Sequence, residues 1–355
     1  MADPTQLKSL LLDRIAMQGP LGLNEYMAEC LLHPEHGYYT TRPPFGAEGD
    51  FITAPEISQM FGELLALCLA QAWIDQGSVS QFTLAELGPG RGTLMADVLR
   101  ATKGVAGFHA AMRVHLIEAS PRLRALQKQA LAGYDVTWAE DISALPAAPL
   151  FLLANEFFDA LPIRQFRREG DMWCETLIGA KDGQLIFGKS APMTLERADT
   201  KTGDIIEVCP SADGIMAQIS QRICDFGGAG LIIDYGGWNG LGDTFQAMQG
   251  HAYVDPLNSP GMADLTAHVD FAALAHAAAP CVCAYTPQAA FLMRLGIAGR
   301  AAVLAKSLTG TALDAHHLAT QRLTAAAEMG ELFKVLGIRP ADAPPLAGFD
   351  LDSLC

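Results

Sequence analysis

Hydrophobic side chains first recur along the chain with the spacing of α-helices. Residues 5–17 and 56–76 carry them three and four positions apart, and the apolar set of the second segment is Ile57, Met60, Phe61, Leu64, Leu65, Cys68 and Leu69. Because an α-helix has about 3.6 residues per turn, this spacing predicts two helices with an apolar face. Residues 33–56 are rich in Gly, Pro and aromatic residues, which predicts an ordered loop between the helices.

After residue 80 the pattern changes to apolar strands that alternate with helices. The predicted strands are apolar runs at 82–87, 112–120, 148–158 and 228–237, with a further strand expected at 134–138. Helices are expected from about residue 93 and over 121–131. This alternation predicts an α/β protein whose parallel, Rossmann-like sheet is covered by helices on both faces.

Two later segments depart from this alternation. Residues 164–209 alternate polar and apolar positions around Asp182-Gly183, which predicts an inserted antiparallel hairpin. Residues 285–338 are rich in Ala and Leu and predict a helical C-terminal part. We therefore expect an N-terminal helical and loop extension, 1–80, that packs on a core domain, 81–355.

Composition narrows the class of protein. Half of the 355 residues are hydrophobic. The chain has 24 Lys and Arg residues and 39 Asp and Glu residues, which gives a net charge of −15. This balance argues against nucleic-acid binding, which needs clustered basic residues. No apolar run reaches the roughly 18 residues of a membrane span, and the first residues resemble neither a signal peptide nor a transit peptide. We expect a cytoplasmic protein of a prokaryotic cell, without membrane insertion.

The stretch "LAELGPGRGTL", residues 84–94, lies where the first strand of the sheet should end and a helix begin. Gly88, Gly90 and Gly92 lack a Cβ, so their backbone N–H groups can approach a ligand closely. The spacing GxGxG differs from the GxGxxG of dinucleotide-binding folds. Together with Glu86 it is similar to the first motif of S-adenosylmethionine-dependent methyltransferases, although a tight strand–helix turn would also explain the glycines.

Acidic residues follow the next two strands. Glu118 ends the second strand, where a carboxylate can accept hydrogen bonds from the ribose hydroxyls of a nucleoside. Asp141, followed by Ile142, comes after the third predicted strand, at the place where methyltransferases often bind the adenine amino group. The alternative for Asp141 is a helix N-cap. We expect these residues, with Thr53 and Asn155, to bind the cofactor.

Several blocks in the same order closely resemble the MidA-like family. They are "GYYTTRPPFGAEGDFITAPEISQMFGE", "ELGPGRGTL", "ANEFFDALPI" and "GHAYVDPLNSPGMADLTAHVDF", and the resemblance covers nearly the whole chain. The family includes the mitochondrial protein arginine methyltransferase that serves assembly of respiratory complex I. The resemblance implies a Rossmann-like fold, S-adenosylmethionine as cofactor, and symmetric ω-N dimethylation of an arginine in the 49-kDa subunit of NADH dehydrogenase.

A candidate acceptor site follows the fourth strand, in Asn155-Glu156-Phe157-Phe158-Asp159. Glu156 and Asp159 are three residues apart, so a helical turn would place both on one face. Paired carboxylates can hold a planar guanidinium through charge-assisted hydrogen bonds, and Asn155 could orient a polar group beside the methyl. The alternative is structural: Asp159 would cap a following helix and Glu156 would form an internal ion pair.

Three further groups of polar residues are weaker candidates. The loop "GDFITAPEIS" offers Asp50, Thr53, Glu56 and Ser58, either as a lid over the cofactor or as helix caps. His268, in the group Asp264, His268 and Asp270, could act as a base tuned by Asp270, but a hydrogen-bonded structural role is favoured for it. His251 is a similar case. No cluster suits a metal. Asp234 and Tyr235 end a strand on the side of the substrate pocket, where a loop-stabilising Asp is an equal explanation.

Other functions stay open at this stage. The fold and the glycine loop do not determine the methyl acceptor, so a small-molecule methyltransferase is one alternative. A non-catalytic assembly factor that retains cofactor binding is another. A nicotinamide or flavin oxidoreductase is disfavoured by GxGxG in place of GxGxxG. The oligomeric state is undetermined, a dimer included.

Overall fold

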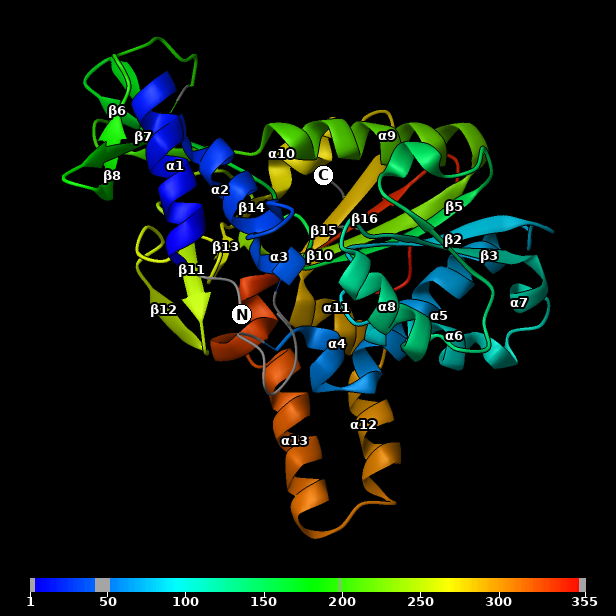
Figure 1. Ribbon diagram of the computed structural model, residues 1–355. Coiled ribbons are helices and arrows are strands. Elements are labelled where there is room, and N and C mark those ends of the chain that lie inside the picture. Colours follow the sequence, from blue (N-terminus) through cyan, green and yellow to red (C-terminus); the bar gives the residue numbers. More distant parts are fainter. Residues whose placement is uncertain (1–3, 42–51, 198, 351–355) are drawn as a thin grey trace. The chain divides into compact units, whose positions relative to one another are not determined.

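The computed structural model describes residues 4–41, 52–197 and 199–350 (Figure 1). The chain divides into two compact units, and each is built from three separate segments. Unit 1 contains Met1–Phe51, Asp159–Asp213 and Gly237–Ala273, and unit 2 contains Ile52–Phe158, Gly214–Gly236 and Leu274–Cys355. This division differs from the expected boundary at residue 80, because the helix expected at 56–76 belongs to unit 2.

Unit 2 contains the expected mostly parallel sheet. Its strand order is β15-β16-β10-β5-β2-β3-β4. The strands are β2 (Phe82–Leu87), β3 (Met112–Ile117), β4 (Val136–Ala139), β5 (Leu150–Asn155), β10 (Gly228–Gly237), β15 (Val282–Pro287) and β16 (Phe333–Arg339). The five strands from β10 to β4 pair in parallel, and β16 pairs antiparallel with both β10 and β15.

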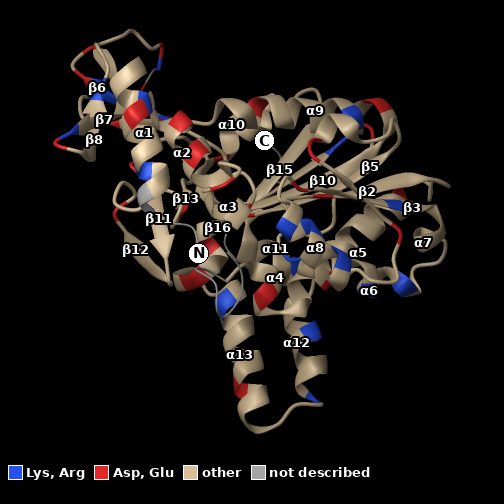
Figure 2. Cartoon of the chain, viewed as in Figure 1, with Lys and Arg blue, Asp and Glu red and all other residues tan. Residues whose placement is uncertain are grey.

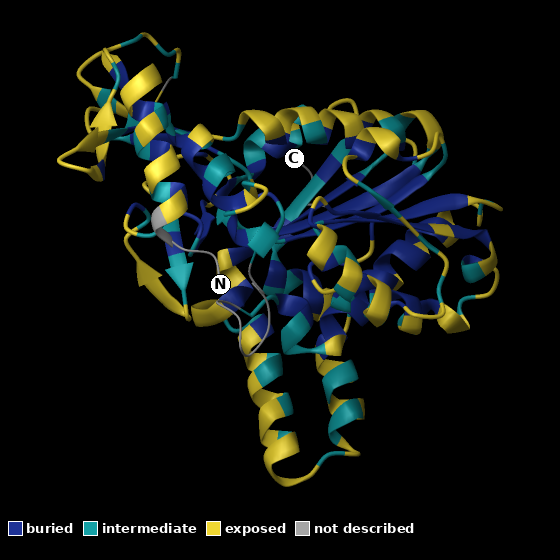
Figure 3. Cartoon of the chain, viewed as in Figure 1, coloured by how far each residue is buried: buried dark blue, intermediate teal, exposed yellow. Residues whose placement is uncertain are grey.

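The central strands are buried on both faces. Every residue of β2 and β5 is buried, as the continuous apolar runs predicted (Figure 3). Figure 1 shows α5 and α6 on one side of the sheet and α9 on the other.

The helices of unit 2 are α4 (Ala54–Ile57), α5 (Gln59–Asp75), α6 (Thr93–Ala101), α7 (Phe108–Ala111), α8 (Pro121–Ala130), α11 (Gln288–Arg294), α12 (Ile297–Ala305) and α13 (Gly310–Thr324). Helix α9 (Pro210–Phe226) begins in unit 1 and ends in unit 2, as does α10 (Phe271–Ala277).

The C-terminal part is less helical than expected. Residues 285–338 contain α11, α12 and α13, but they are framed by β15 and β16. The segment Phe333–Arg339 forms a strand because its residues complete the sheet between β10 and β15, where five of the seven are buried. Ala and Leu content alone did not reveal this tertiary pairing.

Unit 1 carries the predicted hairpin insertion. Strands β7 (Met172–Lys181) and β8 (Gln184–Lys189) pair antiparallel, and the turn residues Asp182 and Gly183 have φ of 50° and 72°. The other strands are β1 (Leu21–Gly22), β6 (Arg164–Glu169), β9 (Ile205–Val208), β11 (Gln246–Gln249), β12 (Ala252–Val254), β13 (Asp264–Thr266) and β14 (Val269–Asp270). The remaining helices are α1 (Pro4–Gln18), α2 (Leu23–Leu32) and α3 (Tyr38–Thr41).

Two further features of the structure are the distribution of acidic residues and the hydrophobicity of the helices. In the view of Figure 2, Asp and Glu lie on loops and helices of both units. Within the described residues, no single helix has the length and hydrophobicity needed to cross a membrane, although α11 and α12, separated by a 68° bend, meet both measures as a pair.

A buried ion-pair network joins three helices of unit 2. Glu63 of α5 is 5% exposed, and its carboxylate accepts hydrogen bonds from Arg300 Nε of α12 at 2.7 Å and from Arg100 Nη1 of α6 at 2.6 Å. Burial by itself would raise the pKa of Glu63, but the hydrogen bonds from Arg300 and Arg100 outweigh it and lower the pKa. The carboxylate is therefore ionised and holds the three helices together.

We expect Glu63→Gln to lower the free energy of unfolding by about 1–2 kcal/mol at neutral pH, because solvent already screens the two partly exposed arginines. A carboxylate whose pKa is depressed on folding stabilises the protein above its unfolded-state pKa and loses that contribution as the pH falls through its folded-state pKa. The difference between the variant and the wild type should therefore shrink on acidification. Urea denaturation at several pH values measures it, with exposed Asp135→Asn as the control. A difference independent of pH would contradict the charged role of Glu63.

Candidate functional site

Three neighbouring parallel strands of unit 2 end at the same edge of the sheet. Leu87, the last residue of β2, pairs with Ile117 of β3 and with Ala154 of β5. The polar residues that follow these strands therefore lie side by side at this edge. In doubly wound sheets, ligands bind beyond the carboxyl ends of the strands.

The glycine-rich loop needs its glycines for backbone conformation. Gly88, Gly90 and Gly92 have φ of 58°, 53° and 86°, in the left-handed region that side chains with a Cβ rarely adopt. A Cβ on Gly88 would also lie 2.9 Å from Cδ2 of Phe157. The loop ends at Gly92, which is the N-cap of α6. The predicted strand–loop–helix context of the motif is confirmed.

Glu118 directly follows β3 and is 8% exposed. Its Oε1 accepts a hydrogen bond from the Ser120 backbone N–H at 2.8 Å, and its Oε2 accepts one from Gln127 Nε2 at 3.1 Å. Burial raises its pKa, while the hydrogen bonds from Ser120 and Gln127 oppose this effect. Two carboxylate oxygens have about four lone-pair sites, so the carboxylate can still accept a hydrogen bond from a ribose hydroxyl.

Gln127 is a residue of this edge that sequence reasoning missed. Its side chain on α8 is fully buried, and its Nε2 also donates to the Gly90 carbonyl at 2.8 Å. Its Oε1 accepts a hydrogen bond from Trp138 Nε1 at 2.8 Å. The segment 121–131 reads as an ordinary polar helix, and nothing in its pattern distinguishes Gln127 from the exposed Gln129.

Glu86 lies in β2, two residues before Gly88, and is 3% exposed. Burial raises the pKa of Glu86 to about 8, opposed by a backbone hydrogen bond from Met95 and reinforced by the nearby charge of Glu118. Its Oε2 is buried and has no hydrogen-bond partner among the described residues. A buried carboxyl oxygen without a partner is unfavourable by itself, so it fits a site whose ligand brings a hydrogen-bond donor.

Asp141 and Ile142 follow β4 at the same edge, since Ala139 pairs with Ile117. Asp141 is exposed, and its Oδ1 accepts a hydrogen bond from the Ser143 backbone N–H at 2.8 Å. This makes Asp141 the N-cap of the 3-10 helix Ile142–Ala144, as the capping alternative predicted. Ile142 is buried. Contact of either residue with adenine stays a prediction.

Asn155 and Glu156 occupy the end of β5. Asn155 Nδ2 donates to Glu156 Oε1 at 3.1 Å, and the Ala54 backbone N–H donates to the same oxygen at 3.1 Å. Asn155 Oδ1 is buried without a hydrogen-bond partner in the part of the chain that the structure describes. Glu156 has φ of 50°, a conformation that is uncommon for a residue with a side chain and is concentrated at functional sites.

The expected helical turn from Glu156 to Asp159 is wrong. Glu156 is a bend with positive φ, and residues 156–161 contain bends and turns but no helix. The argument that both carboxylates share one helical face therefore fails, and Asp159 caps no following helix either. Asp159 belongs to unit 1, is 6% exposed, and its carbonyl accepts a hydrogen bond from the Ala267 N–H.

The segment before α5 contacts the glycine loop and the start of α6 through Glu56, and its role as a lid over the cofactor stays a prediction. Glu56 Oε1 accepts a hydrogen bond from Thr93 Oγ1 at 2.5 Å, and its Oε2 lies 3.7 Å from Arg91 Nη1. Ser58 caps α5 by accepting a bond from the Met60 N–H, and Thr53 is the N-cap residue of α4 without a side-chain cap bond. Asp50 lies outside the described residues.

Two further candidates, Asp234 and His251, lie at the end of a strand and in a turn. Asp234 Oδ2 accepts a bond from the Phe158 N–H and its Oδ1 one from the Tyr235 N–H, which favours the loop-stabilising explanation. His251 lies in the turn between β11 and β12 with φ of 60°.

His268 is an exposed residue of unit 1, and desolvation by the surrounding protein lowers its pKa. Asp270 Oδ1 accepts hydrogen bonds from the N–H groups of Ala272 and Ala273 at the start of α10, and its tuning of His268 stays a prediction. Asp264 Oδ1 accepts a hydrogen bond from Tyr39 OH at 2.8 Å. Among the described residues, no group of three or more His, Cys, Asp or Glu is arranged to hold a metal ion.

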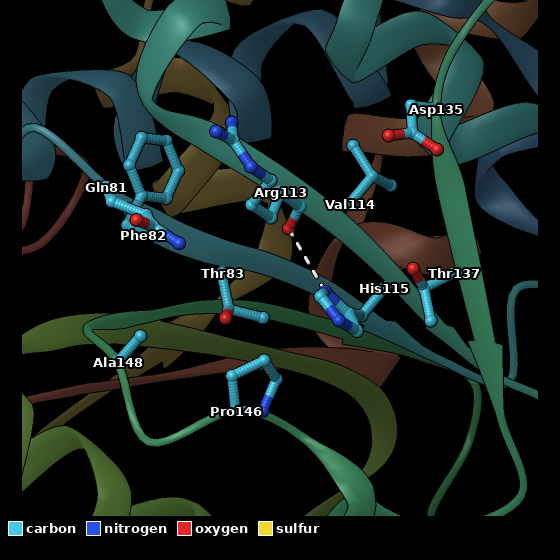
Figure 4. A pocket seen from close by; sticks show the side chains of 10 residues that line it. All are labelled: Gln81, Phe82, Thr83, Arg113, Val114, His115, Asp135, Thr137, Pro146 and Ala148. Carbon is cyan, nitrogen blue, oxygen red and sulfur yellow. Dashed lines mark hydrogen bonds between the residues drawn. The ribbon is translucent and has the colours of Figure 1, made fainter.

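A small pocket of about 110 Å³ lies at the opposite edge of the sheet, where β2 and β3 begin (Figure 4). Its lining includes Gln81, Arg113, His115 and Asp135. It is smaller than the roughly 300–1,000 Å³ of small-molecule and cofactor sites, and it is remote from the glycine loop along the strands. We therefore do not assign the cofactor to it.

Glu86 predicts a specific dependence of stability on pH. A carboxyl group whose pKa rises on folding stabilises the folded state fully below its unfolded-state pKa, and this contribution is lost as the pH rises through the folded-state value. The free energy of unfolding of the ligand-free protein should fall between about pH 4.5 and pH 8. Glu86→Gln should flatten this part of the curve, as urea denaturation across that range would measure. An unchanged slope in the variant would contradict a neutral, buried Glu86.

Comparison with known proteins supports the cofactor expectation. The model of the Methyltransf_28 family, S-adenosyl-L-methionine-dependent methyltransferases, matches residues 64–286. The chain is 35% identical to "Protein arginine methyltransferase NDUFAF7, mitochondrial" of Xenopus tropicalis, over 98% of this chain and 90% of that protein. The human protein of the same name is 37% identical, over 83% of this chain and 74% of its own length. These mitochondrial relatives contradict the expected cytoplasmic location.

Solved structures support the same assignment. A protein of Burkholderia thailandensis, crystallised with bound S-adenosyl-homocysteine, has a TM-score of 0.84 and 29% identity, covering 98% of this chain and 95% of that chain. A native crystal structure from the same organism has a TM-score of 0.81 and 30% identity over the same shares. The expected Rossmann-like methyltransferase fold and the expected cofactor, S-adenosylmethionine, are confirmed. The chain belongs to the Methyltransf_28 family of S-adenosylmethionine-dependent methyltransferases.

Proposed function

We propose that this methyltransferase transfers methyl groups to an arginine side chain of a protein, and that Glu156 binds the guanidinium group. The names of the relatives, protein arginine methyltransferases, support the substrate class. The observation that carries the proposal is the geometry at the end of β5. There Glu156 stands in a strained backbone conformation beside Asn155 Oδ1, which has no hydrogen-bond partner within the described ranges. Strain of this kind persists where the surrounding structure holds a side chain for function.

The cofactor would be held by the edge formed by β2, β3, β4 and β5. The backbone of the glycine loop and the carboxyl of Glu86 would bind its methionyl part, Glu118 would bind its ribose, and Asp141 and Ile142 would contact the adenine. Thr53 and Asn155 would complete the site. When bound, S-adenosylmethionine supplies a methyl group on a positively charged sulfur.

The chemistry of the acceptor explains why a carboxylate is needed. A guanidinium is protonated at neutral pH, with a pKa of about 12.5–13.8, and its nitrogens are poor nucleophiles. A carboxylate that accepts two N–H bonds holds the planar group and keeps positive charge on the nitrogens that do not react. Glu156 Oε1 is already oriented by Asn155 Nδ2 and the Ala54 N–H, so little reorganisation is required when the substrate binds.

We further propose the specific reaction that the family resemblance implies. It is symmetric ω-N dimethylation of an arginine in the 49-kDa subunit of NADH dehydrogenase, as an aid to complex I assembly. Asp159 and His268 stay candidate catalytic residues. Both belong to unit 1, and neither role has direct support in the hydrogen bonds described above.

Glu156→Gln should abolish most of the methyl transfer while leaving cofactor binding intact. The amide keeps the size of the side chain but loses the negative charge, so we expect a fall of roughly 100-fold or more in turnover. The measurement is intact-mass analysis of the 49-kDa subunit purified from cells that contain the wild type, the variant or neither.

The control for this experiment is Asp314→Asn, which removes an exposed carboxylate of α13. S-adenosylhomocysteine should bind the wild type, Glu156→Gln and the control equally in calorimetry. An identical subunit mass in all cells would remove the proposed substrate. Full activity of Glu156→Gln would instead remove the proposed role of the residue.

Gly88→Ala should weaken S-adenosylhomocysteine binding by at least about tenfold. The new Cβ would meet Phe157 at 2.9 Å, and positive φ is unfavourable for Ala, so the loop must move away from its ligand-binding shape. Calorimetric titration measures the change.

The matched control is Gly133→Ala. Gly133 has φ of 98°, and a Cβ added there would meet no described atom within 4 Å. The control therefore carries the backbone strain without the clash at the site. Equal loss of binding in both variants would show a general loss of stability and contradict a cofactor site at Gly88.

A further inference from the structure

Helix α8 (Pro121–Ala130) and its N-cap residue donate three hydrogen bonds to Glu118, one from a backbone N–H and two from side chains. Ser120 is the N-cap of the helix, and its own N–H donates to Glu118 Oε1. Arg124 Nε donates to the Glu118 carbonyl at 2.7 Å. Gln127 Nε2 donates to Glu118 Oε2. Arg124 and Gln127 are three positions apart in α8, so their side chains lie on one face of the helix.

Gln127 differs from the other two because it also contacts the glycine loop. One amide nitrogen donates to both the Gly90 carbonyl, at 2.8 Å, and Glu118 Oε2, at 3.1 Å. It has two N–H groups, so each acceptor can receive its own hydrogen bond. A single buried side chain therefore connects the two cofactor-facing elements that follow β2 and β3.

Trp138 determines how this amide is oriented. Its Nε1–H donates to Gln127 Oε1 at 2.8 Å, which requires the oxygen of the amide to face β4 and the nitrogen to face Gly90 and Glu118. Because Gln127 is fully buried, these protein groups satisfy it in place of water. The side chain has no freedom to turn without breaking a hydrogen bond.

From this arrangement we propose that Gln127, oriented by Trp138, is a positioning residue for S-adenosylmethionine: it holds the Glu118 carboxylate at a set distance from the Gly90 backbone so that the ribose hydroxyls are bound. The inference rests on the proposed assignment of Glu118 to the ribose. It does not depend on the methyl acceptor, so cofactor binding tests it separately from arginine methylation.

The test compares two ligands in calorimetry, S-adenosylhomocysteine and its 2′-deoxy analogue, which lacks one ribose hydroxyl. The wild type should bind the complete ribose more tightly. Gln127→Met keeps the length of the side chain but removes the amide, and it should weaken S-adenosylhomocysteine binding by roughly tenfold to a hundredfold. It should weaken the 2′-deoxy analogue by much less, so discrimination between the two ligands is lost.

Trp138→Phe is a second variant that removes only the indole N–H from the network. It should also reduce the preference for S-adenosylhomocysteine over the 2′-deoxy analogue, by a smaller factor than Gln127→Met. Circular dichroism shows whether Gln127→Met folds, and if it does not, Trp138→Phe tests the inference. Gln129→Glu, on the exposed face of the same helix, should bind both ligands like the wild type.

Two outcomes would overturn the inference, and they are distinguishable. If the variants lose affinity for both ligands equally, or keep full discrimination, Gln127 has a structural role only. If the wild type itself binds both ligands equally, the assignment of Glu118 to the ribose fails, and the positioning role fails with it. Neither result bears on whether Glu156 binds an arginine.

Discussion

The parallel pairing of β2, β3 and β5 is the constraint on which the rest of the site depends. It brings the ends of three strands to one edge, although the residues that follow them, Gly88, Glu118 and Glu156, are about 30 to 70 positions apart in the chain. The central strands β2 and β5 can lie next to one another because they are mostly apolar and buried on both faces, and β3 is buried except at Arg113. The polar residues of the site are thus placed by the packing of an apolar core.

A polar group that is buried at this edge without a hydrogen-bond partner lowers the stability of the folded protein. Glu118 is satisfied by Ser120 and Gln127, and Glu156 Oε1 by Ala54 and Asn155. Glu86 Oε2 and Asn155 Oδ1 differ, because neither has a partner in the described part of the chain. Glu86 lies on β2, which leads into the glycine loop, and Asn155 ends the neighbouring strand β5. A ligand that donates hydrogen bonds to them would gain affinity by relieving their desolvation.

Local signals predicted much of this site, and tertiary contacts explain the errors. Glycines at alternate positions after an apolar strand have few structural explanations, so Gly88, Gly90 and Gly92 were identified from sequence. The turn from Glu156 to Asp159 was predicted wrongly as helical, because a spacing of three residues is compatible with a helix. In the structure Glu156 has positive φ and residues 156–161 form bends and turns. The strand Phe333–Arg339 was missed because it depends on pairing with β10 and β15.

The sequence by itself determined the alternation of strands and helices, the glycine loop and the acids that follow the strands, because each depends on hydrophobic periodicity or on the conformational freedom of single residues. Only the tertiary structure decided that Gln127 joins Gly90 to Glu118, that Glu56 reaches Thr93, and that the chain divides into two units of three segments each. These features are contacts between residues distant in sequence. A buried glutamine and an exposed one look alike in a helical pattern, and only packing distinguishes them.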